Sequence, residues 1–110
     1  MITFLSKNLV GYILKNFYLH IMQYVYVLQS NKDKEIYVGC TKDLKKRFVL
    51  HNAKKVASTK RHAPYSLIYY EAYVNERDAF AREQYMKTGW GKTFLRKTLN
   101  NFFINKNLEG

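Results

Sequence analysis

Hydrophobic and polar positions along the chain mark out three short strands. β-Branched and aromatic residues dominate from Gln23 to Gln29, from Glu35 to Cys40 and from Leu67 to Tyr73, and such runs predict strands. The polar sequence SNKDKE separates the first two runs. Because only a short turn joins them, we expect these two strands to pair as an antiparallel hairpin.

A helical pattern follows the hairpin. Leu44 and Phe48 lie four residues apart and predict the buried face of a helix that runs from about Lys42 to Ala53. Thr41 precedes this segment and belongs to the residue types that cap helix N-termini. The following residues, KKVASTKRHAP, predict a basic loop that ends at Pro64.

Two further helices are predicted after the third strand. Asn75 is a favourable cap followed by acidic residues, so we expect a helix that runs to about Thr88. Gly89 is expected to end that helix, and a last helix is expected from Lys92 to Phe103. The order ββαβαα predicts the α+β class, as a small three-stranded antiparallel sheet flanked by helices.

The length of the chain, 110 residues, allows one domain. We expect this domain to span residues 23–104, with residues 105–110 as a C-terminal tail. The first 21 residues contain two Lys and no acidic residue, and a different composition begins at Met22. We therefore interpret residues 1–22 as an N-terminal extension and Met22 as a candidate start of the natural protein.

The charge balance bears on function rather than on the fold. Nineteen Lys and Arg stand against eight Asp and Glu, which gives a net charge of +11 and a pI near 9.8. This excess predicts attraction to polyanions, with nucleic acid ahead of an anionic membrane. The longest uncharged run, residues 16–31, contains polar residues and is not typical of a membrane span. The single cysteine, Cys40, excludes an intrachain disulfide and a Cys-rich zinc module, and favours a cytoplasmic setting.

The basic residues concentrate in one segment. Residues 42–61 hold eight Lys or Arg against one acidic residue. Such a run is either a solvated face or a surface that contacts phosphates. It covers both a predicted helix and the loop that follows, and it interleaves with Ser58, Thr59 and His62, which favours phosphate contact. The expected nucleic-acid-binding residues are Lys42, Lys45, Lys46, Lys54, Lys55, Lys60 and Arg61.

Glu83 occupies an unusual position. In its predicted helix it shares a face with the apolar residues Ala79, Phe80 and Met86. A carboxylate on a buried face is costly unless a cation, hydrogen-bond donors or a metal ion compensates it. Two interpretations are open: an ion pair with a nearby Lys or Arg, or a ligand for Mg²⁺, which often takes only one or two protein carboxylates.

Arg47 and His51 lie four residues apart and so share one face of their predicted helix. The guanidinium of Arg47 offers a fixed fork of donors to a phosphate. His51 could relay a proton, because the unperturbed pKa of histidine lies near neutrality. The alternative for each is an ordinary residue of the helix surface, and His51 taken alone favours that alternative.

Taken together, these residues resemble the GIY-YIG nuclease family. YVY at Tyr24–Tyr26 stands where the family has GIY, and YVG at Tyr37–Gly39 matches YIG. Arg47 follows ten residues after the second motif tyrosine, and the family's metal-binding glutamate matches Glu83 in REQYMK. The run STKRHAPYSLIYYEAY is similar to the small free-standing branch of the family, which is related to the N-terminal domain of the nuclease component of excinuclease ABC.

The resemblance implies a metal-dependent endonuclease that cleaves a phosphodiester in a single displacement. It implies that Tyr26 is the general base or positions the attacking water, and that Tyr37 joins the network of water and metal. It also implies that Arg47 binds the scissile phosphate and that Glu83 holds one Mg²⁺ or Mn²⁺ ion. His51 stands where relatives carry His or Tyr, which implies a supporting role.

The chain departs from the family pattern at four positions. Val25 and Val38 replace the two motif isoleucines, which are nearly neutral changes in a strand. Tyr24 replaces the first motif glycine, and Cys40 replaces a lysine that often follows YIG, which removes one candidate activating cation. A second function therefore stays open, that of a nucleic-acid-binding protein that keeps the scaffold without efficient cleavage.

DNA is the expected partner of this chain, in repair or recombination, with RNA as an alternative. The basic residues support an enzyme and a binding protein equally, because both need phosphate contacts. The matched residues Tyr26, Tyr37, Arg47 and Glu83 favour the enzyme. A protein partner or self-association is a further possibility for targeting, and no membrane partner is expected.

Overall fold

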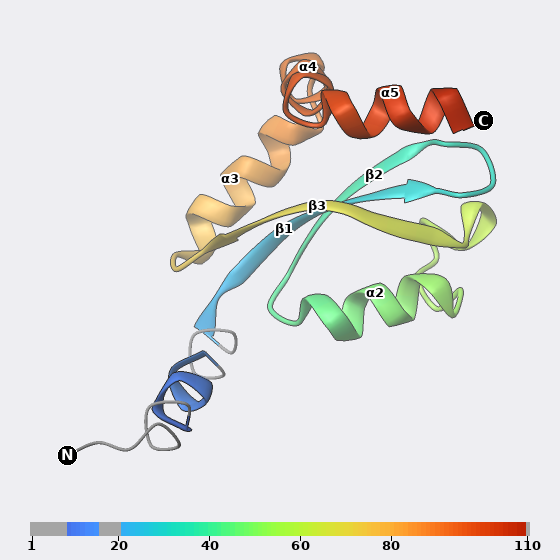
Figure 1. The fold of residues 1–110 in the computed structure, drawn as a ribbon. Helices are drawn as coiled ribbons and strands as arrows, with labels where there is room; N and C mark the ends of the chain where they lie inside the picture. The colour runs from blue at the N-terminus through green and yellow to red at the C-terminus, as the bar shows by residue number, and fades with distance from the viewer. Residues whose placement is uncertain (1–8, 16–20, 110) are drawn as a thin grey trace.

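The computed structural model describes residues 9–15 and 21–109. Residues 9–15 are helical and lie apart from the sheet (Figure 1). Of the expected N-terminal extension, residues 1–8 and 16–20 lie outside the described ranges. No helix within these ranges is long and apolar enough to cross a membrane.

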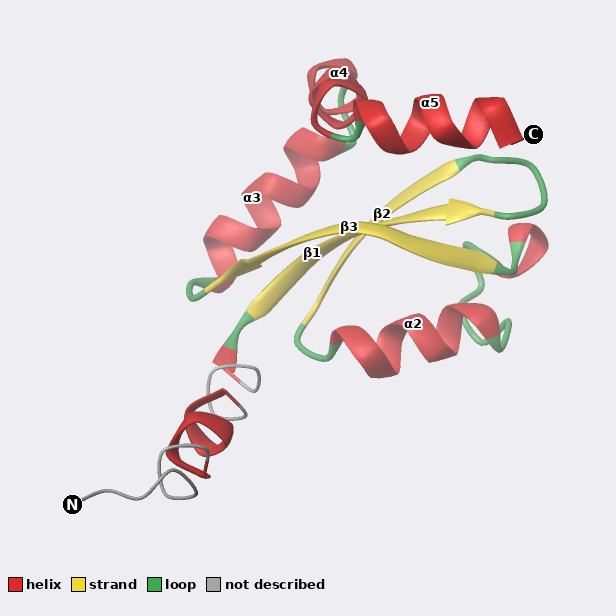
Figure 2. Ribbon diagram, in the orientation of Figure 1, coloured by secondary structure: helices red, strands yellow, loops and turns green. Residues whose placement is uncertain are grey.

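A three-stranded antiparallel sheet forms the centre of the fold (Figure 2). Its strands are β1 (Gln23–Ser30), β2 (Ile36–Thr41) and β3 (Tyr65–Tyr73), in the order β2-β1-β3. Every residue of the central strand β1 is buried, because it pairs on both edges and is covered on both faces. The predicted hairpin and the predicted α+β class are confirmed.

Helices cover the two faces of the sheet unequally. Helix α2 (Leu44–Asn52) lies on one side, and α3 (Glu76–Met86), α4 (Gly89–Thr98) and α5 (Asn100–Glu109) lie on the other (Figure 1). A short 3₁₀ turn, η1 (Lys60–His62), precedes β3.

Alternation along β1 divides the core into two clusters. Val25 and Val27 pack with Ala79 and Met86 on the α3 side, in a cluster that also contains Leu95. The intervening residues point to the opposite face, because successive side chains of a strand alternate. Tyr26 and Leu28 therefore pack on the α2 side, in a second cluster completed by Ala63 and Tyr65.

The predicted start of α2 is wrong by two residues. Asp43, not Thr41, is the N-cap, and its Oδ1 accepts a hydrogen bond from the backbone N–H of Lys46 at 3.0 Å. Thr41 instead ends β2, and its Oγ1 accepts the N–H of Asp43 at 3.1 Å. Both residues are good cap types, so composition alone did not separate them.

The predicted single C-terminal helix is also wrong, because two helices occupy that part of the chain. Gly89 begins α4 rather than ending α3, since the Oγ1 of Thr88 accepts the N–H of Gly91 at 3.3 Å. α4 ends at Thr98 with Leu99 as its C-cap, and α5 begins at Asn100. Over residues 23–109 the order of strands and α-helices is thus ββαβααα, with one helix more than predicted there.

A partly buried ion pair anchors α3 to the sheet. Arg82 donates from Nε and Nη2 to the two carboxylate oxygens of Glu71, at 2.9 and 3.1 Å. The hydroxyls of Tyr69 and Tyr73 donate to the same carboxylate, each at 2.5 Å. Because Glu71 lies on β3 and Arg82 precedes Glu83, these contacts fix the part of α3 that carries Glu83.

The close passage of α4 over the end of α3 gives a stability prediction. A Cβ added at Gly91 would lie 2.4 Å from the backbone oxygen of Tyr85 and from Cα of Met86. Gly91→Ala should therefore lower the free energy of unfolding by about 1–3 kcal/mol. Chemical denaturation measures the change.

The matched control is Gly89→Ala, because nothing lies within 4 Å of a Cβ added there. Its stability should equal or exceed that of the wild type by up to about 1 kcal/mol. Equal stability of the two variants would contradict the account of the α3–α4 contact.

Candidate active site

The ring of Tyr26 lies directly over Gly39. The two residues face each other across the β1–β2 pairing. A Cβ added at Gly39 would lie 2.4 Å from Cζ and from the hydroxyl oxygen of Tyr26. No described glycine has a positive φ angle, so Gly39 is required for close approach and not for an unusual backbone conformation. This contact fixes where the Tyr26 hydroxyl lies.

The two motif tyrosines lie on the same side of the sheet. The ring centroids of Tyr26 and Tyr37 are 6.3 Å apart, and that of Tyr37 is 5.1 Å from that of His51. Both tyrosines belong to the cluster beneath α2. Strand alternation thus gathers three polar rings in one place.

His51 connects Tyr26 to the loop after α2. It is fully buried, with Nε2 at 2.8 Å from the Tyr26 hydroxyl and Nδ1 at 2.7 Å from Oγ1 of Thr59. The interpretation of His51 as an ordinary surface residue is therefore wrong, because its face of α2 packs against the sheet. Tyr65 holds the loop in place by donating its hydroxyl to the backbone oxygen of Thr59 at 3.0 Å.

The hydrogen bonds of Thr59 favour one direction of proton donation. Its hydroxyl has one proton, and the backbone oxygen of Val56 lies 3.4 Å from Oγ1 as an acceptor. When the proton points to Val56, Oγ1 accepts from Nδ1–H of His51, whose nitrogen lies 2.7 Å away. Because a neutral imidazole carries only one N–H, Nε2 is then an acceptor and takes the hydrogen bond of the Tyr26 hydroxyl.

Burial keeps both members of this pair uncharged at neutral pH. It raises the pKa of Tyr26 to about 12, although the nearby Arg47 guanidinium acts in the opposite direction. Burial, and then the positive charge of Arg47, lower the pKa of His51 to about 4. Tyr26 is thus a phenol that faces an unprotonated nitrogen base.

Arg47 and Glu83 approach this pair from opposite helices. Arg47 is half-buried on α2, and its charge acts on both Tyr26 and His51. Glu83 lies on α3, and the negative charge of its carboxylate contributes to the raised pKa values of Tyr26 and Cys40. The charges of Arg47 and Glu83 thus both act on the Tyr26 hydroxyl, while Tyr26, Tyr37 and His51 are in ring contact.

The surroundings of Glu83 differ in part from the prediction. Ala79 and Met86 are buried, but Phe80 is 59% exposed and does not share their face. The Glu83 side chain is 13% exposed and lies 3.5 Å from Nζ of Lys87, so the ion-pair interpretation has a partner in the structure. An ion pair this exposed on the lysine side contributes little to stability.

The carboxylate of Glu83 is compatible with a metal ion shared with a substrate. No group of three or more His, Cys, Asp and Glu that could hold a metal occurs among residues 9–15 and 21–109. Mg²⁺ and similar ions, however, often take one protein carboxylate and complete their shell with water and phosphate oxygens. Glu83 fits that donor set, and the ammonium group of Lys87 would have to move away from the carboxylate for a metal ion to bind.

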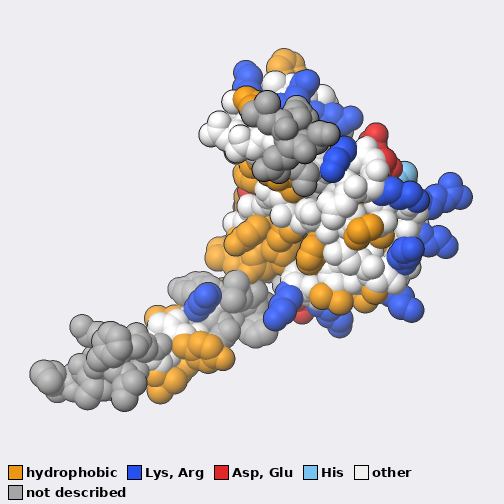
Figure 3. Space-filling model, turned by 45° about the vertical axis from the view of Figure 1, so that its right-hand side comes forward, with side chains coloured by type: hydrophobic (Ala, Val, Ile, Leu, Met, Phe, Trp, Pro, Cys, Tyr) orange, Lys and Arg blue, Asp and Glu red, His pale blue; other side chains and the backbone are white. Residues whose placement is uncertain are grey.

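All seven predicted nucleic-acid-binding side chains are exposed. They lie before, on and after α2, and in η1. Figure 3 shows a face with many more Lys and Arg than acidic side chains. Two neighbours do not share the predicted role, because Thr59 is buried against His51, and His62 forms an ion pair with Asp33.

Comparisons with known proteins show the family of the chain. Residues 22–98 match the model of the GIY-YIG catalytic domain. The chain belongs to the GIY-YIG family. This is a family of nucleases whose members generally depend on a divalent metal ion. No solved structure matches the chain.

Curated relatives of similar size carry names that state no activity. The chain is 42% identical over 67 residues to UPF0213 protein CPE1444 of Clostridium perfringens, covering 60% of this chain and 71% of that protein. It is 45% identical over 65 residues to UPF0213 protein SpyM50708 of Streptococcus pyogenes, covering 58% and 70% respectively. These GIY-YIG relatives support membership of the small free-standing branch.

The close approach at Gly39 predicts a site-specific defect. Gly39→Ala should displace the Tyr26 ring and remove the proton contacts between the Tyr26 and His51 rings, because the added methyl group overlaps the tyrosine. Nuclear Overhauser effects between the two rings measure this directly. Gly89→Ala is the control with no neighbour to displace, and contacts that persist in Gly39→Ala would contradict the prediction.

The lowered pKa of His51 predicts how stability depends on pH. The unfolded chain takes up a proton at His51 near pH 6.5, whereas the folded protein does so only near pH 4. The contribution of His51 is therefore complete above pH 6.5 and is lost as the pH falls toward 4. The denaturation midpoint of the wild type should fall between pH 7 and pH 5 more than that of His51→Gln. Parallel pH profiles for the two proteins would contradict this.

Proposed function

We propose that the protein is a metal-dependent endonuclease that hydrolyses phosphodiester bonds in DNA, within the cytoplasm and in repair or recombination. The observation that supports this most directly is the Tyr26 hydroxyl bonded to a buried, neutral His51 beside Arg47 and Glu83. A carboxylate beside bound phosphates would weaken the affinity of a protein that only binds nucleic acid, so Glu83 favours the enzyme.

Tyr26 and His51 would activate the attacking water as a relay. The Tyr26 oxygen takes a proton from the water while its own proton passes to Nε2 of His51. The hydroxide formed would bond to phosphorus while the bond from phosphorus to the leaving oxygen breaks, and a solvent water would protonate that oxygen. The proton on His51 would then return through Tyr26 to solvent. The Nδ1–H group of His51 keeps its hydrogen bond to Oγ1 of Thr59 throughout. The ring therefore keeps its orientation while Nε2 carries the second proton.

Arg47 and Glu83 would arrange the phosphate in front of this relay. The guanidinium of Arg47 presents paired donors to the phosphate oxygens and stabilises the charge that develops on them. Glu83 would hold one Mg²⁺ or Mn²⁺, which supplies positive charge beside the phosphate and the leaving oxygen. The hydroxyl of Tyr37 would hydrogen-bond into the same water network.

The second candidate function is nucleic-acid binding without cleavage. Two observations favour it: Lys87 pairs with the Glu83 carboxylate, and Cys40 stands where relatives often carry a lysine. The seven exposed basic residues around α2 would serve this function equally well. RNA is the alternative polymer for either function, and a protein partner or self-association remains the proposed route to targeting.

A nicking assay separates the two functions. Supercoiled plasmid and a branched duplex are incubated at low salt with Mg²⁺ or Mn²⁺. Tyr26→Phe, which keeps the ring over Gly39, and Glu83→Gln should each lower the cleavage rate at least ~100-fold, because each removes a group from the reacting centre. Anisotropy with labelled DNA in EDTA should show unchanged binding by both variants.

Two results would overturn the proposal. The first is a wild type that binds DNA and never cuts it with either metal, which would leave the binding function. The second is cleavage by both variants at the rate of the wild type, which would remove Tyr26 and Glu83 from the mechanism.

A further inference from the structure

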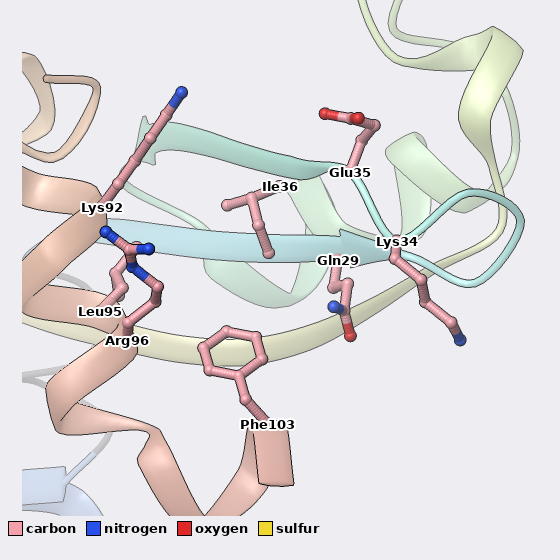
Figure 4. A pocket seen from close by; sticks show the side chains of 8 residues that line it. All are labelled: Gln29, Lys34, Glu35, Ile36, Lys92, Leu95, Arg96 and Phe103. Carbon is pink, nitrogen blue, oxygen red and sulfur yellow. The ribbon is translucent and has the colours of Figure 1, made fainter. Parts of the chain in front are cut away.

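A second concave site lies on the side of the sheet opposite α2. It is a pocket of about 490 Å³ between the β1–β2 hairpin and helices α4 and α5 (Figure 4). Tyr26 and His51 belong to the other face, so the pocket is no extension of the candidate active site. Nothing in the proposed reaction uses it.

Gln29 is the unusual residue of this pocket. It continues the inward row of Val25 and Val27 along β1, yet it is polar and only 5% exposed. Its Oε1 has no hydrogen-bond partner among the described residues. A buried acceptor without a partner costs roughly 1–3 kcal/mol, and most such atoms in folded proteins are paired. A ligand that donates to Gln29 would recover that free energy.

Three apolar side chains stand around Gln29. Ile36 faces it across the β1–β2 pairing, and Leu95 of α4 and the ring of Phe103 of α5 also line the pocket. The other lining residues are charged: Lys34, Glu35, Lys92 and Arg96. Figure 4 shows the Gln29 side chain extending from β1 on the side where Phe103 lies. An aromatic ring and aliphatic side chains beside an amide form a site of the kind that holds an unstacked nucleobase.

A second hollow adjoins the pocket and suits a phosphate. Arg96 lines both hollows and is shared with Thr93, Lys97 and Asn100, which line the second one, also of about 490 Å³. Each of these four side chains offers a hydrogen-bond donor, and two are cationic. No acidic residue lines this hollow.

We propose that these two hollows bind an adenine nucleotide, with its base beside Gln29 and its phosphate on Arg96 and Lys97. A glutamine amide matches adenine because it donates to N7 and accepts from the N6 amino group. A rotation about the last torsion of Gln29 turns Oε1 toward the base. The nucleotide is either free or an unstacked residue of a strand, and the strand version rests on the proposed function.

Two-dimensional NMR of the isotopically labelled full-length chain tests the proposal. The probes are 5′-AMP, 5′-CMP and the hexanucleotides dA₆ and dC₆, in EDTA so that no turnover is needed. The adenine probes should shift the side-chain amide signals of Gln29, the ring signals of Phe103 and the Nε–H signal of Arg96. These shifts should reach a plateau as the probe concentration rises. A site-resolved readout is needed because the basic residues around α2 also attract these anions.

Three variants sharpen the test. Gln29→Leu should weaken adenine binding at the Phe103 signals about tenfold, as expected for one lost bidentate contact, without lowering thermal stability. Arg96→Ala, a surface change that leaves the core intact, should weaken binding several-fold. Arg77→Ala removes the same charge from exposed α3 and should leave the pocket titration unchanged.

The outcomes distinguish a free nucleotide from a nucleic-acid strand, and the pocket from the proposed nuclease activity. Saturation at a lower concentration of 5′-AMP than of dA₆ identifies a free nucleotide, and the reverse order identifies a strand. Either result supports the pocket. Shifts confined to α2, equal binding of cytosine and adenine probes, or full binding by Gln29→Leu would overturn it. A protein that binds here but never cleaves DNA would contradict the proposed nuclease and not this site.

Discussion

The hydrogen bond between Tyr26 and His51 is the interaction on which the rest of the candidate site depends. It exists because Gly39 lets the tyrosine ring lie against the backbone of β2, and because Thr59 holds the imidazole from the far side. Each partner restricts the next, so the hydroxyl has a fixed position and a fixed direction of donation. The residues nearest the proposed chemistry are therefore set by packing before any substrate arrives.

The central strand separates the candidate active site from the proposed nucleotide pocket by its side-chain alternation. One face of β1 presents Tyr26 toward α2, and the other presents Val25 and Val27 toward α3. Glu83 lies on α3, and the charge of its carboxylate acts on the Tyr26 hydroxyl. The ion pair between Arg82 and Glu71 holds this part of α3 against the sheet. A sheet of three strands can thus carry a reactive centre on one side and a separate pocket on the other.

The sequence predicted the parts that depend on local pattern. Three strands and the hairpin follow from residue pattern and turn composition, and the structure confirms them. It did not predict the role of Thr59, because that residue reaches His51 through a loop whose path is set by Tyr65 and β3. It also did not predict the extra helix break at Leu99, because no proline or glycine marks it. Local sequence pattern does not predict long-range contacts, and it does not decide between neighbouring residues that can both cap a helix.

The central claim is that His51 is a neutral base whose Nε2 accepts the proton of Tyr26. The ¹⁵N chemical shifts of its two ring nitrogens, followed from pH 5 to pH 8 in the wild type, test this most directly. We expect Nδ1 to carry the proton and Nε2 to keep the shift of an unprotonated acceptor over the whole range. A proton on Nε2, or an imidazole that is protonated on both nitrogens near neutral pH, would contradict the relay.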